Sequence, residues 1–335
     1  MYYFMNSDDA QYLNEISYGY WKAQVLFVAV ELDVFTVIGG GGKSGKVIAK
    51  KIGTDLRATE MFLNALVSLR LLKKTKEMYR NTVVSKRCLT KNSPIYQGDR
   101  IHHFHNMWDY WSRLSTAVKT GKPTAFDNAK EDIDEPRLRE FIRAMHNIAT
   151  VQAGEIYRKL QIEKYSRLLD LAGGQGTYAV RFAEKNQNLK AVVFDLPDVI
   201  KIAGDHIKES GLTGQIVTQA GNCLEDNFGK ELYDIVLVSN LLHIYEAAEN
   251  QKILKKCWDS LMKKGIVVVQ EFILNPAKTM PLFGTLFSLN MLMGTRSGSS
   301  YSAVEIKEWL KKAGFKNIKR INLGMDSGLI SGCKL

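Results

Sequence analysis

The chain has 335 residues, of which 45% are hydrophobic and 24% charged, the proportions of a globular protein. They exclude a collagen, a coiled coil and a wholly disordered chain. No apolar stretch reaches the roughly 18 to 20 residues that cross a bilayer, and the chain does not open with a basic and apolar leader, so we expect neither a membrane span nor secretion. The four cysteines form no CxxC pair, which favours a cytoplasmic location over a disulfide framework or a zinc knuckle.

The net charge of +11 is concentrated in one segment. Residues 41–100 hold 14 Lys and Arg against 4 Asp and Glu, and so carry +10 of that charge. A basic segment attracts phosphates, which keeps nucleic-acid binding open as a function. The other interpretation is a solvated surface that attracts anionic substrates.

The N-terminal part of the chain predicts a winged helix. Apolar residues recur at helical spacing over residues 11–36, which indicates one or two helices. A short helix at Val47–Lys51 and a longer one at Arg57–Leu72 follow, as in a helix-turn-helix. The segment Lys73–Leu89 alternates in places, as the two strands of a wing would. Residues 41–90 therefore predict a winged helix.

The rest of the chain predicts an α/β fold. Residues 101–160 are helical in pattern and rich in aromatic side chains, as in a connector. Beyond them, short apolar strands alternate with helical stretches, which indicates a mainly parallel, doubly wound sheet. The five predicted strands are Arg167–Leu171, Val192–Asp195, Gln215–Thr218, Asp234–Val238 and Ile266–Glu271.

A glycine turn follows the first of these strands. Its sequence, Gly-Gly-Gln-Gly at residues 173–176, lets the backbone turn sharply beside a ligand, and the helix that follows offers free N–H groups. The GxGxxA pattern that starts at Gly174 and the carboxylate of Asp195 at the next strand end are typical of ribose-containing cofactors. NAD and S-adenosylmethionine both fit, and a turn without a ligand is a third interpretation.

The later strand ends distinguish the two cofactors. The third strand ends at Gly221-Asn222-Cys223, the fourth runs into Ser239-Asn240-Leu241-Leu242-His243, and the fifth ends at Gln270-Glu271. With these segments the chain resembles the class I S-adenosylmethionine-dependent small-molecule O-methyltransferases that have an N-terminal winged-helix dimerisation domain, of the plant caffeate and bacterial polyketide or hydroxyneurosporene types. The resemblance covers essentially the whole chain, and its other markers are Trp111…Thr120-Gly121-Lys122-Pro123, Phe141…Met145, Phe194-Asp195-Leu196-Pro197 and Ala313-Gly314-Phe315.

The resemblance implies a Rossmann-like, mostly parallel sheet with an antiparallel C-terminal strand, beside a mainly α winged-helix domain. The expected parts are a dimerisation domain at 1–100, a helical connector lining the substrate pocket at 101–160, and a cofactor-binding methyltransferase domain at 161–335. The expected partners are a second copy of the chain, whose N-terminal helices help to wall the pocket, and a small aromatic or heteroaromatic substrate. We expect no membrane and no nucleic-acid partner.

The resemblance also implies that S-adenosylmethionine is the methyl donor and S-adenosylhomocysteine the product. The glycines would hold the methionine part, Asp195 the ribose, and Leu196 would flank the adenine. Asn222 stands where the family usually has an acidic residue, and Ser239 or Asn240 where it often has Lys or Arg. The expected cofactor-binding residues are Asp170, Gly173, Gly174, Gly176, Asp195, Leu196, Asn222, Cys223 and Ser239.

Two residues are expected to carry the catalysis. A sulfonium methyl group is already activated, so the enzyme has to align the nucleophile and remove its proton. The resemblance assigns the base to His243 and the carboxylate that orients its ring to Glu271. The other interpretation is that His243 caps a strand and Glu271 is solvated.

The sequence departs from the family near these residues. Ile244-Tyr245 follow the histidine in place of Asp-Trp, and Ser300-Tyr301-Ser302 stand where a Glu-Arg-Thr triplet supplies a second glutamate. Transfer to nitrogen, sulfur or carbon therefore stays open beside transfer to a hydroxyl. A winged-helix DNA-binding regulator that senses the cofactor and an NAD-dependent oxidoreductase are the alternatives from other classes.

An apolar wall is expected to bind a flat aromatic substrate, although a stripe of Met and aromatic residues is also typical of an ordinary core. His102, His103 and His105 lack HxxxH spacing, so no metal site is expected. The expected substrate-binding residues are Trp108, Trp111, Phe141, Met145, Tyr245, Phe287 and Met291.

Overall fold

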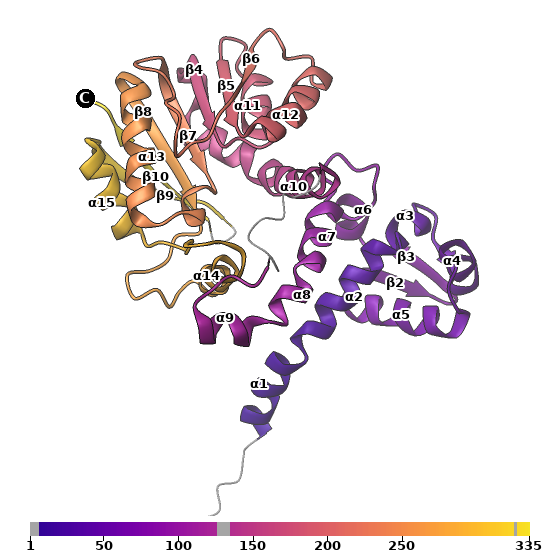
Figure 1. Cartoon of the computed structure of the whole chain (residues 1–335). Coiled ribbons are helices and arrows are strands. Elements are labelled where there is room, and N and C mark those ends of the chain that lie inside the picture. Colours follow the sequence, from indigo (N-terminus) through magenta and orange to yellow (C-terminus); the bar gives the residue numbers. More distant parts are fainter. Residues whose placement is uncertain (1–6, 126–134, 325–326) are drawn as a thin grey trace, which may run out of the picture. The chain divides into compact units, whose positions relative to one another are not determined.

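The structure, a computed structural model, describes residues 7–125, 135–324 and 327–335, and the chain forms two compact units, Met1–Asn106 and Met107–Leu335 (Figure 1). The first unit contains α1 (Ser7–Ser17), α2 (Gly19–Glu31), α3 (Val34–Ile38), β1 (Lys43–Ser44), α4 (Gly45–Ile52), α5 (Leu56–Ser68), β2 (Leu72–Thr75), β3 (Met78–Asn81), α6 (Val83–Cys88) and α7 (Gly98–Asn106). The second contains α8 (Trp108–Trp111), α9 (Leu114–Thr120), α10 (Glu135–Leu160), β4 (Arg167–Leu171), α11 (Thr177–Ala183), β5 (Lys190–Asp195), α12 (Pro197–Glu209), β6 (Ile216–Ala220), β7 (Tyr233–Ser239), α13 (Ala247–Ser260), β8 (Leu261–Glu271), α14 (Leu282–Gly294), α15 (Ala303–Ala313), β9 (Lys316–Asn322) and β10 (Gly328–Cys333).

The first unit contains a winged helix. Its three strands pair in the order β1-β3-β2 beside α4 and α5. A cap that the sequence analysis did not identify starts α5, where the Asp55 carboxylate accepts a hydrogen bond from the backbone N–H of Ala58 at 2.8 Å. The core of this unit is apolar, and its fully buried side chains include Phe35, Ile38, Ile48, Leu63, Leu66 and Tyr79.

Two predicted boundaries in this unit are wrong. The helix predicted to reach Leu72 ends at Ser68, because Arg70 has a left-handed φ of 59° and reverses the chain into β2. The second half of the predicted wing is the helix α6, which starts where the Thr82 hydroxyl accepts from the Ser85 N–H at 3.3 Å. The wing is therefore the short hairpin of β2 and β3.

The second unit is built on a seven-stranded sheet in the order β6-β5-β4-β7-β8-β10-β9. The first five strands in this order are parallel, and β10 is antiparallel to both β8 and β9. This confirms the predicted fold class: a mostly parallel Rossmann-like sheet with antiparallel C-terminal pairing. In the part of the chain that the structure describes, no helix is long and apolar enough to cross a membrane.

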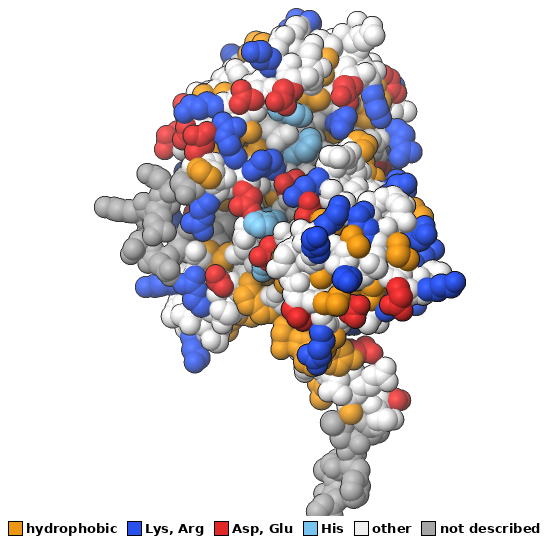
Figure 2. Space-filling model, turned by 90° about the vertical axis from the view of Figure 1, so that its right-hand side faces the viewer, with side chains coloured by type: hydrophobic (Ala, Val, Ile, Leu, Met, Phe, Trp, Pro, Cys, Tyr) orange, Lys and Arg blue, Asp and Glu red, His pale blue; other side chains and the backbone are white. Residues whose placement is uncertain are grey.

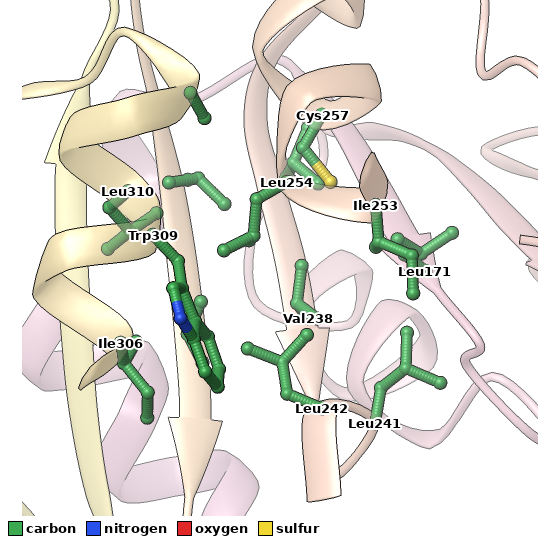
Figure 3. Packing of buried hydrophobic residues seen from close by; sticks show 14 of the residues in the cluster. Leu171, Val238, Leu241, Leu242, Ile253, Leu254, Cys257, Ile306, Trp309 and Leu310 are labelled. Atoms are coloured by element: carbon green, nitrogen blue, oxygen red, sulfur yellow. The ribbon is translucent and has the colours of Figure 1, made fainter. Parts of the chain in front are cut away.

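Helices cover both faces of this sheet. Successive residues of a strand point to opposite faces, so Leu169 packs in the cluster formed with α13 and α15, whereas Leu168 packs in the cluster formed with α10, α11 and α12. Figure 3 shows the first cluster, in which Leu254 of α13 and Trp309 of α15 pack together with Val238 of β7. Both layers are buried hydrocarbon, and they fix the strands that carry the site.

The carboxyl ends of the parallel strands meet at one edge of the sheet. In open α/β sheets this edge is where ligands bind. At this edge of the sheet lie the glycine turn after β4, Asp195 from β5, the segment after β6, Ser239 from β7 and Glu271 from β8. The fold thus gathers most of the predicted cofactor-binding and catalytic residues at one edge.

Candidate active site

The glycine turn joins β4 to α11 and has an unusual backbone. Gly174 and Gly176 have φ angles of +59° and +77°, which favour glycine. A Cβ atom on Gly173 would lie 2.8 Å from the Asp170 carboxylate carbon, whereas one on Gly174 would meet no atom within 4 Å. Gly173 is therefore required by packing, while Gly174 borders open space. The backbone at Gly174 is therefore open to the close approach of a ligand.

Asp195 closes the side of this turn. Its two carboxylate oxygens accept hydrogen bonds from the N–H of Gly174 at 2.8 Å and of Leu196 at 2.7 Å. Burial raises the pKa of Asp195 to about 6, although the two N–H donors oppose the shift. Leu196 is 51% exposed at the same edge. A carboxylate beside an exposed apolar side chain fits a ribose and its base.

Two buried acceptors at this edge of the sheet have spare capacity. Oδ2 of Asp170 accepts from the Ala179 N–H at 3.3 Å, but its Oδ1 has no hydrogen-bond partner among the described residues. Burial raises the pKa of Asp170 to about 7, opposed by the Ala179 N–H and assisted by the charge of Asp195. The Asn240 Oδ1 is likewise buried without a partner in the described part of the chain. Such acceptors suit a ligand that brings N–H donors.

The segment after β6 forms the expected adenine side. The amide oxygen of Asn222 accepts from the Leu224 N–H at 3.0 Å and keeps a second lone pair, so the side chain can still accept from a ligand or donate to it. The Cys223 sulfur lies 3.5 Å from the Tyr245 hydroxyl. Burial raises the pKa of Tyr245 above its usual value. Tyr245, expected to bind substrate, thus lies beside a residue expected to bind the cofactor.

His243 and Glu271 form a buried pair. His243 lies in the 3₁₀ turn Leu242–Ile244 after β7, and Glu271 ends the neighbouring strand β8. The His243 Nδ1 is 2.8 Å from the Glu271 Oε2, and the two residues are 8% and 3% exposed. Because a carboxylate only accepts, Nδ1 carries the hydrogen and Nε2 presents its lone pair. The pair is the arrangement of a base and its orienting group.

Backbone contacts hold the histidine in place. The Asn250 side chain donates to the carbonyl oxygens of Leu242 at 2.8 Å and Tyr245 at 3.1 Å. The His243 carbonyl accepts from the Ser299 N–H at 2.9 Å, and its own N–H donates to the Glu271 Oε1 at 3.3 Å. The imidazole therefore projects from a backbone that is fixed on three sides.

An aromatic wall stands beside the imidazole. The Phe287 ring meets the His243 ring edge-on at 4.9 Å, and Phe272 packs against Phe287 at 4.8 Å. The Trp111 indole donates to the Asn290 side chain at 3.1 Å, which joins α8 to α14. The remaining expected wall residues differ in exposure: Met291 is buried and Met145 half-buried, whereas Trp108 and Phe141 are 40% and 41% exposed.

A polar network that the sequence analysis missed lies beneath the site. The Gln270 Oε1 accepts from the hydroxyls of Tyr178 and Ser239, each at 2.9 Å, and its amide donates to Gln152. The hydroxyl hydrogen of Ser239 is therefore engaged by Gln270. The position of Gln270, directly before Glu271 at a strand end, is the sequence signal that could have identified it.

Among the residues that the structure describes, no second carboxylate contacts the imidazole in place of the family glutamate expected at Ser300. Ser300 is 2% exposed, and its hydroxyl has no partner among the described side chains. The neighbouring Tyr301 hydroxyl donates to the Tyr245 carbonyl oxygen at 2.5 Å, and Ser302 caps α15. This segment has structural roles, and Glu271 alone contacts the imidazole through a carboxylate in the described residues.

The three histidines at 102, 103 and 105 lie on α7, in the first unit. His105 stacks on Phe27 at 5.3 Å and lies 3.9 Å from the Glu31 carboxylate. Across the described ranges, no three His, Cys, Asp or Glu side chains are grouped as metal ligands.

Comparison with known proteins identifies the family. Residues 111–316 match the O-methyltransferase domain and residues 14–91 the O-methyltransferase dimerisation domain. A 3-hydroxy-5-methyl-1-naphthoate 3-O-methyltransferase of Streptomyces sahachiroi is 30% identical over 328 residues, 96% of this chain and 94% of that protein. An N,N-dimethyltransferase of Streptomyces rimosus is 27% identical over 317 residues, 92% of this chain and 91% of that protein.

The fold match is equally broad. The crystal structure of human N-acetylserotonin methyltransferase in complex with S-adenosylmethionine aligns with a TM-score of 0.90 at 25% identity, and the match covers 100% of this chain and 99% of that one. The resemblance stated from the sequence is thereby confirmed. The chain belongs to the O-methyltransferase family, and it is a methyltransferase that takes its methyl group from S-adenosylmethionine.

Proposed function

We propose that the protein methylates a hydroxyl group of a small aromatic or heteroaromatic compound, with His243 as the general base and Glu271 as its orienting carboxylate. The observation that carries the proposal is the buried contact of 2.8 Å between the His243 Nδ1 and the Glu271 Oε2. When bound, S-adenosylmethionine supplies a methyl group already activated by its sulfonium. The protein's own residues then have to place the acceptor and accept its proton.

The proton transfer follows from the hydrogen bonds of the pair. Glu271 keeps the hydrogen of His243 on Nδ1, so Nε2 can take the proton of an acceptor hydroxyl. A phenol has a pKa of about 10 and a free imidazole one of about 6.5, so the imidazole does not remove the phenol's proton completely before the methyl transfer. Only partial removal of this proton in the transition state is needed. The buried carboxylate then stabilises the positive charge on the ring. Phe287 shields the imidazole from water on one side.

The aromatic wall supports an aromatic acceptor. Phe272, Phe283 and Phe287 form a contiguous cluster with ring centroids 4.8 to 5.9 Å apart, next to the imidazole. Planar apolar compounds bind well to such surfaces. Two of the relatives whose names state an acceptor act on a hydroxynaphthoate and on N-acetylserotonin, and we propose that this protein takes an acceptor of the same size class.

The test is a panel of phenols, hydroxynaphthoates and hydroxyindoles incubated with the enzyme and labelled S-adenosylmethionine. We expect O-methyl product from the wild type and a loss of at least a hundredfold in turnover for His243→Ala. A His243→Ala variant with an intact rate at neutral pH removes the histidine from the mechanism.

A second candidate is transfer to nitrogen, favoured by the similarity to an N,N-dimethyltransferase and by the single carboxylate at the histidine. A neutral amine attacks through its own lone pair and loses a proton only after the N–C bond has formed, so the methyl transfer itself depends less on a base than transfer to a phenol does. Aromatic amines in the same panel distinguish the two. Product on nitrogen with no product on any hydroxyl would replace the first proposal.

We further propose that residues 1–100 form the dimerisation domain of a cytoplasmic homodimer, that 101–160 connect it to the catalytic domain at 161–335, and that no nucleic acid is bound. Large apolar side chains are exposed along α1 and α2, as on a surface that a second copy of the chain buries. These side chains are Tyr12, Leu13, Ile16, Tyr20 and Trp21.

The charges support the absence of nucleic acid. On the face that Figure 2 shows, Lys and Arg side chains are interspersed with Asp and Glu.

A further inference from the structure

Two histidines outside the proposed catalytic pair meet beside the glycine turn. His146 lies on α10 and His206 on α12, and their ring centroids are 5.2 Å apart. The two helices are joined there by a small buried cluster that includes Ile142, Val199 and Ile202. The histidines therefore project from a packed junction.

Each histidine contacts one side of the turn. The His206 Nδ1 is 2.9 Å from the carbonyl oxygen of Gln175, so the ring donates to this carbonyl. The His146 Nδ1 is 2.8 Å from the Thr177 hydroxyl. Gln175 and Thr177 flank Gly176 and are themselves buried. The turn is thus attached to α10 and α12 on both sides of its last glycine.

The bond from His206 fixes a peptide plane. The carbonyl of Gln175 and the N–H of Gly176 belong to the same peptide group, and that N–H donates to the Gly173 carbonyl oxygen at 2.9 Å. The peptide is therefore held at both ends. Because Gly176 tolerates many backbone angles, this peptide would rotate more readily if the His206 bond were lost. Rotation would break the bond that closes the turn at Gly173.

His146 acts as a neutral partner. Burial lowers its pKa to about 4, and the charges of His206 on α12 and Arg181 on α11, which face it, add to the effect. A neutral ring has one donor and one acceptor nitrogen, which matches the hydroxyls of Thr177 and Thr150, the latter 3.5 Å from Nε2. The contact to Thr177 therefore persists throughout the neutral pH range.

We propose that His146 and His206 are positioning residues of the cofactor site, which hold the glycine turn in the shape that binds the methionine part of S-adenosylmethionine. The proposal rests on the placement of the cofactor at this turn. His206 orients the Gln175–Gly176 peptide, and His146 anchors the first residue of α11. Neither ring needs to contact the cofactor or the acceptor.

The test measures S-adenosylhomocysteine binding to the full chain by calorimetry. His206→Leu removes the donor, whereas His206→Asn places an amide N–H near the position of Nδ1 and should restore the bond. We expect the Leu variant to bind about tenfold more weakly, the loss of one buried hydrogen bond, and the Asn variant to bind within threefold of the wild type. His146→Leu should also weaken binding. Lys208→Leu, an exposed change on the same helix, is the control.

Two further readouts separate positioning from general damage. In steady-state kinetics, KM for S-adenosylmethionine should rise in His206→Leu, while kcat and KM for the acceptor stay unchanged. In the ligand-free protein, amide hydrogens of residues 173–177 should exchange faster, with the rest of the sheet unaffected. A His206→Leu variant that binds as the wild type does overturns the proposal, as does a loss that Asn fails to restore. A wild type that binds no S-adenosylhomocysteine overturns the cofactor placement itself.

Discussion

Replacing Glu271 by Gln tests the central contact of the proposed mechanism. The substitution keeps the size and one acceptor oxygen of the side chain but removes its charge. The Glu271 Oε2 lies 2.8 Å from the His243 Nδ1, and the two residues are 3% and 8% exposed, so solvent screens the pair only weakly. The charge should matter most when the imidazole holds the acceptor's proton, because only then is the ring positive.

The size of the effect follows from this geometry. Two unit charges whose centres are about 4 Å apart attract by about 4 kcal/mol at an effective dielectric constant of about 20. A neutral amide that still accepts from Nδ1 retains about 1 kcal/mol. The net loss of about 3 kcal/mol falls on the transition state, and it corresponds to a decrease of about a hundredfold in the rate of methyl transfer.

The assay is single-turnover transfer of labelled methyl to the best acceptor of the panel, with enzyme in excess. Binding of S-adenosylhomocysteine and the melting temperature should stay within error of the wild type, because Glu271 is not expected to contact the cofactor. Glu246→Gln removes an exposed carboxylate three residues after His243, and should change the rate less than twofold. A Glu271→Gln rate within threefold of the wild type would refute the proposed role.

Three other predictions concern the cofactor and the dimer. Burial raises the pKa of Asp195 to about 6 in the ligand-free protein, and ribose hydroxyls favour the ionised form of its carboxylate. S-adenosylhomocysteine should therefore bind more weakly as the pH falls below 6, by up to about tenfold per pH unit. A calorimetric binding profile that is flat between pH 5 and 8 contradicts this. Gly174 and Gly211 have φ angles of +59° and +73°, and a Cβ atom at either position would meet open space. Gly174→Ala and Gly211→Ala should each lower the free energy of unfolding by about 1 to 2 kcal/mol. Only Gly174→Ala should weaken S-adenosylhomocysteine binding, by tenfold or more. Trp21→Asp should convert the dimer to a monomer, as measured by the molecular mass in light scattering, whereas Val84→Asp, at a 71% exposed position, should leave it a dimer. Equal masses for both variants argue against the α1–α2 surface as the dimer interface.

The parallel strands could be predicted because their signal is local. Each is a short apolar run, and the structure places strands at all five predicted positions, from β4 to β8. The end of the helix α5 could not be predicted in this way. Leu69, Leu71 and Leu72 continue the apolar pattern, and only the left-handed φ of Arg70 separates helix from strand. Nothing in the residue type of an arginine signals that conformation.

In the candidate site, too, some residues could be predicted from the sequence and others could not. His243 and Glu271 could be paired from the sequence through the family resemblance, which makes the fourth and fifth strands neighbours whose carboxyl ends meet at one edge. The contacts of His146 and His206 with the turn join two helices 60 residues apart to a loop between them, and no periodic pattern encodes such a junction. The partners of Gln270 were missed for the same reason, since Tyr178 reaches it from a helix.

The missing second glutamate need not leave the imidazole loosely held. A second carboxylate would restrict the ring through another charge, but here the restriction comes from neutral groups on the backbone. Asn250 binds the carbonyls before and after the histidine, and the N–H of Ser299 binds the histidine's own carbonyl at 2.9 Å. Phe287 limits the ring's rotation from its edge. Glu271 thus shares the orientation of the ring with these neutral groups, whereas the charge that stabilises the protonated ring comes from Glu271, which is why its charge, more than its shape, should control the rate.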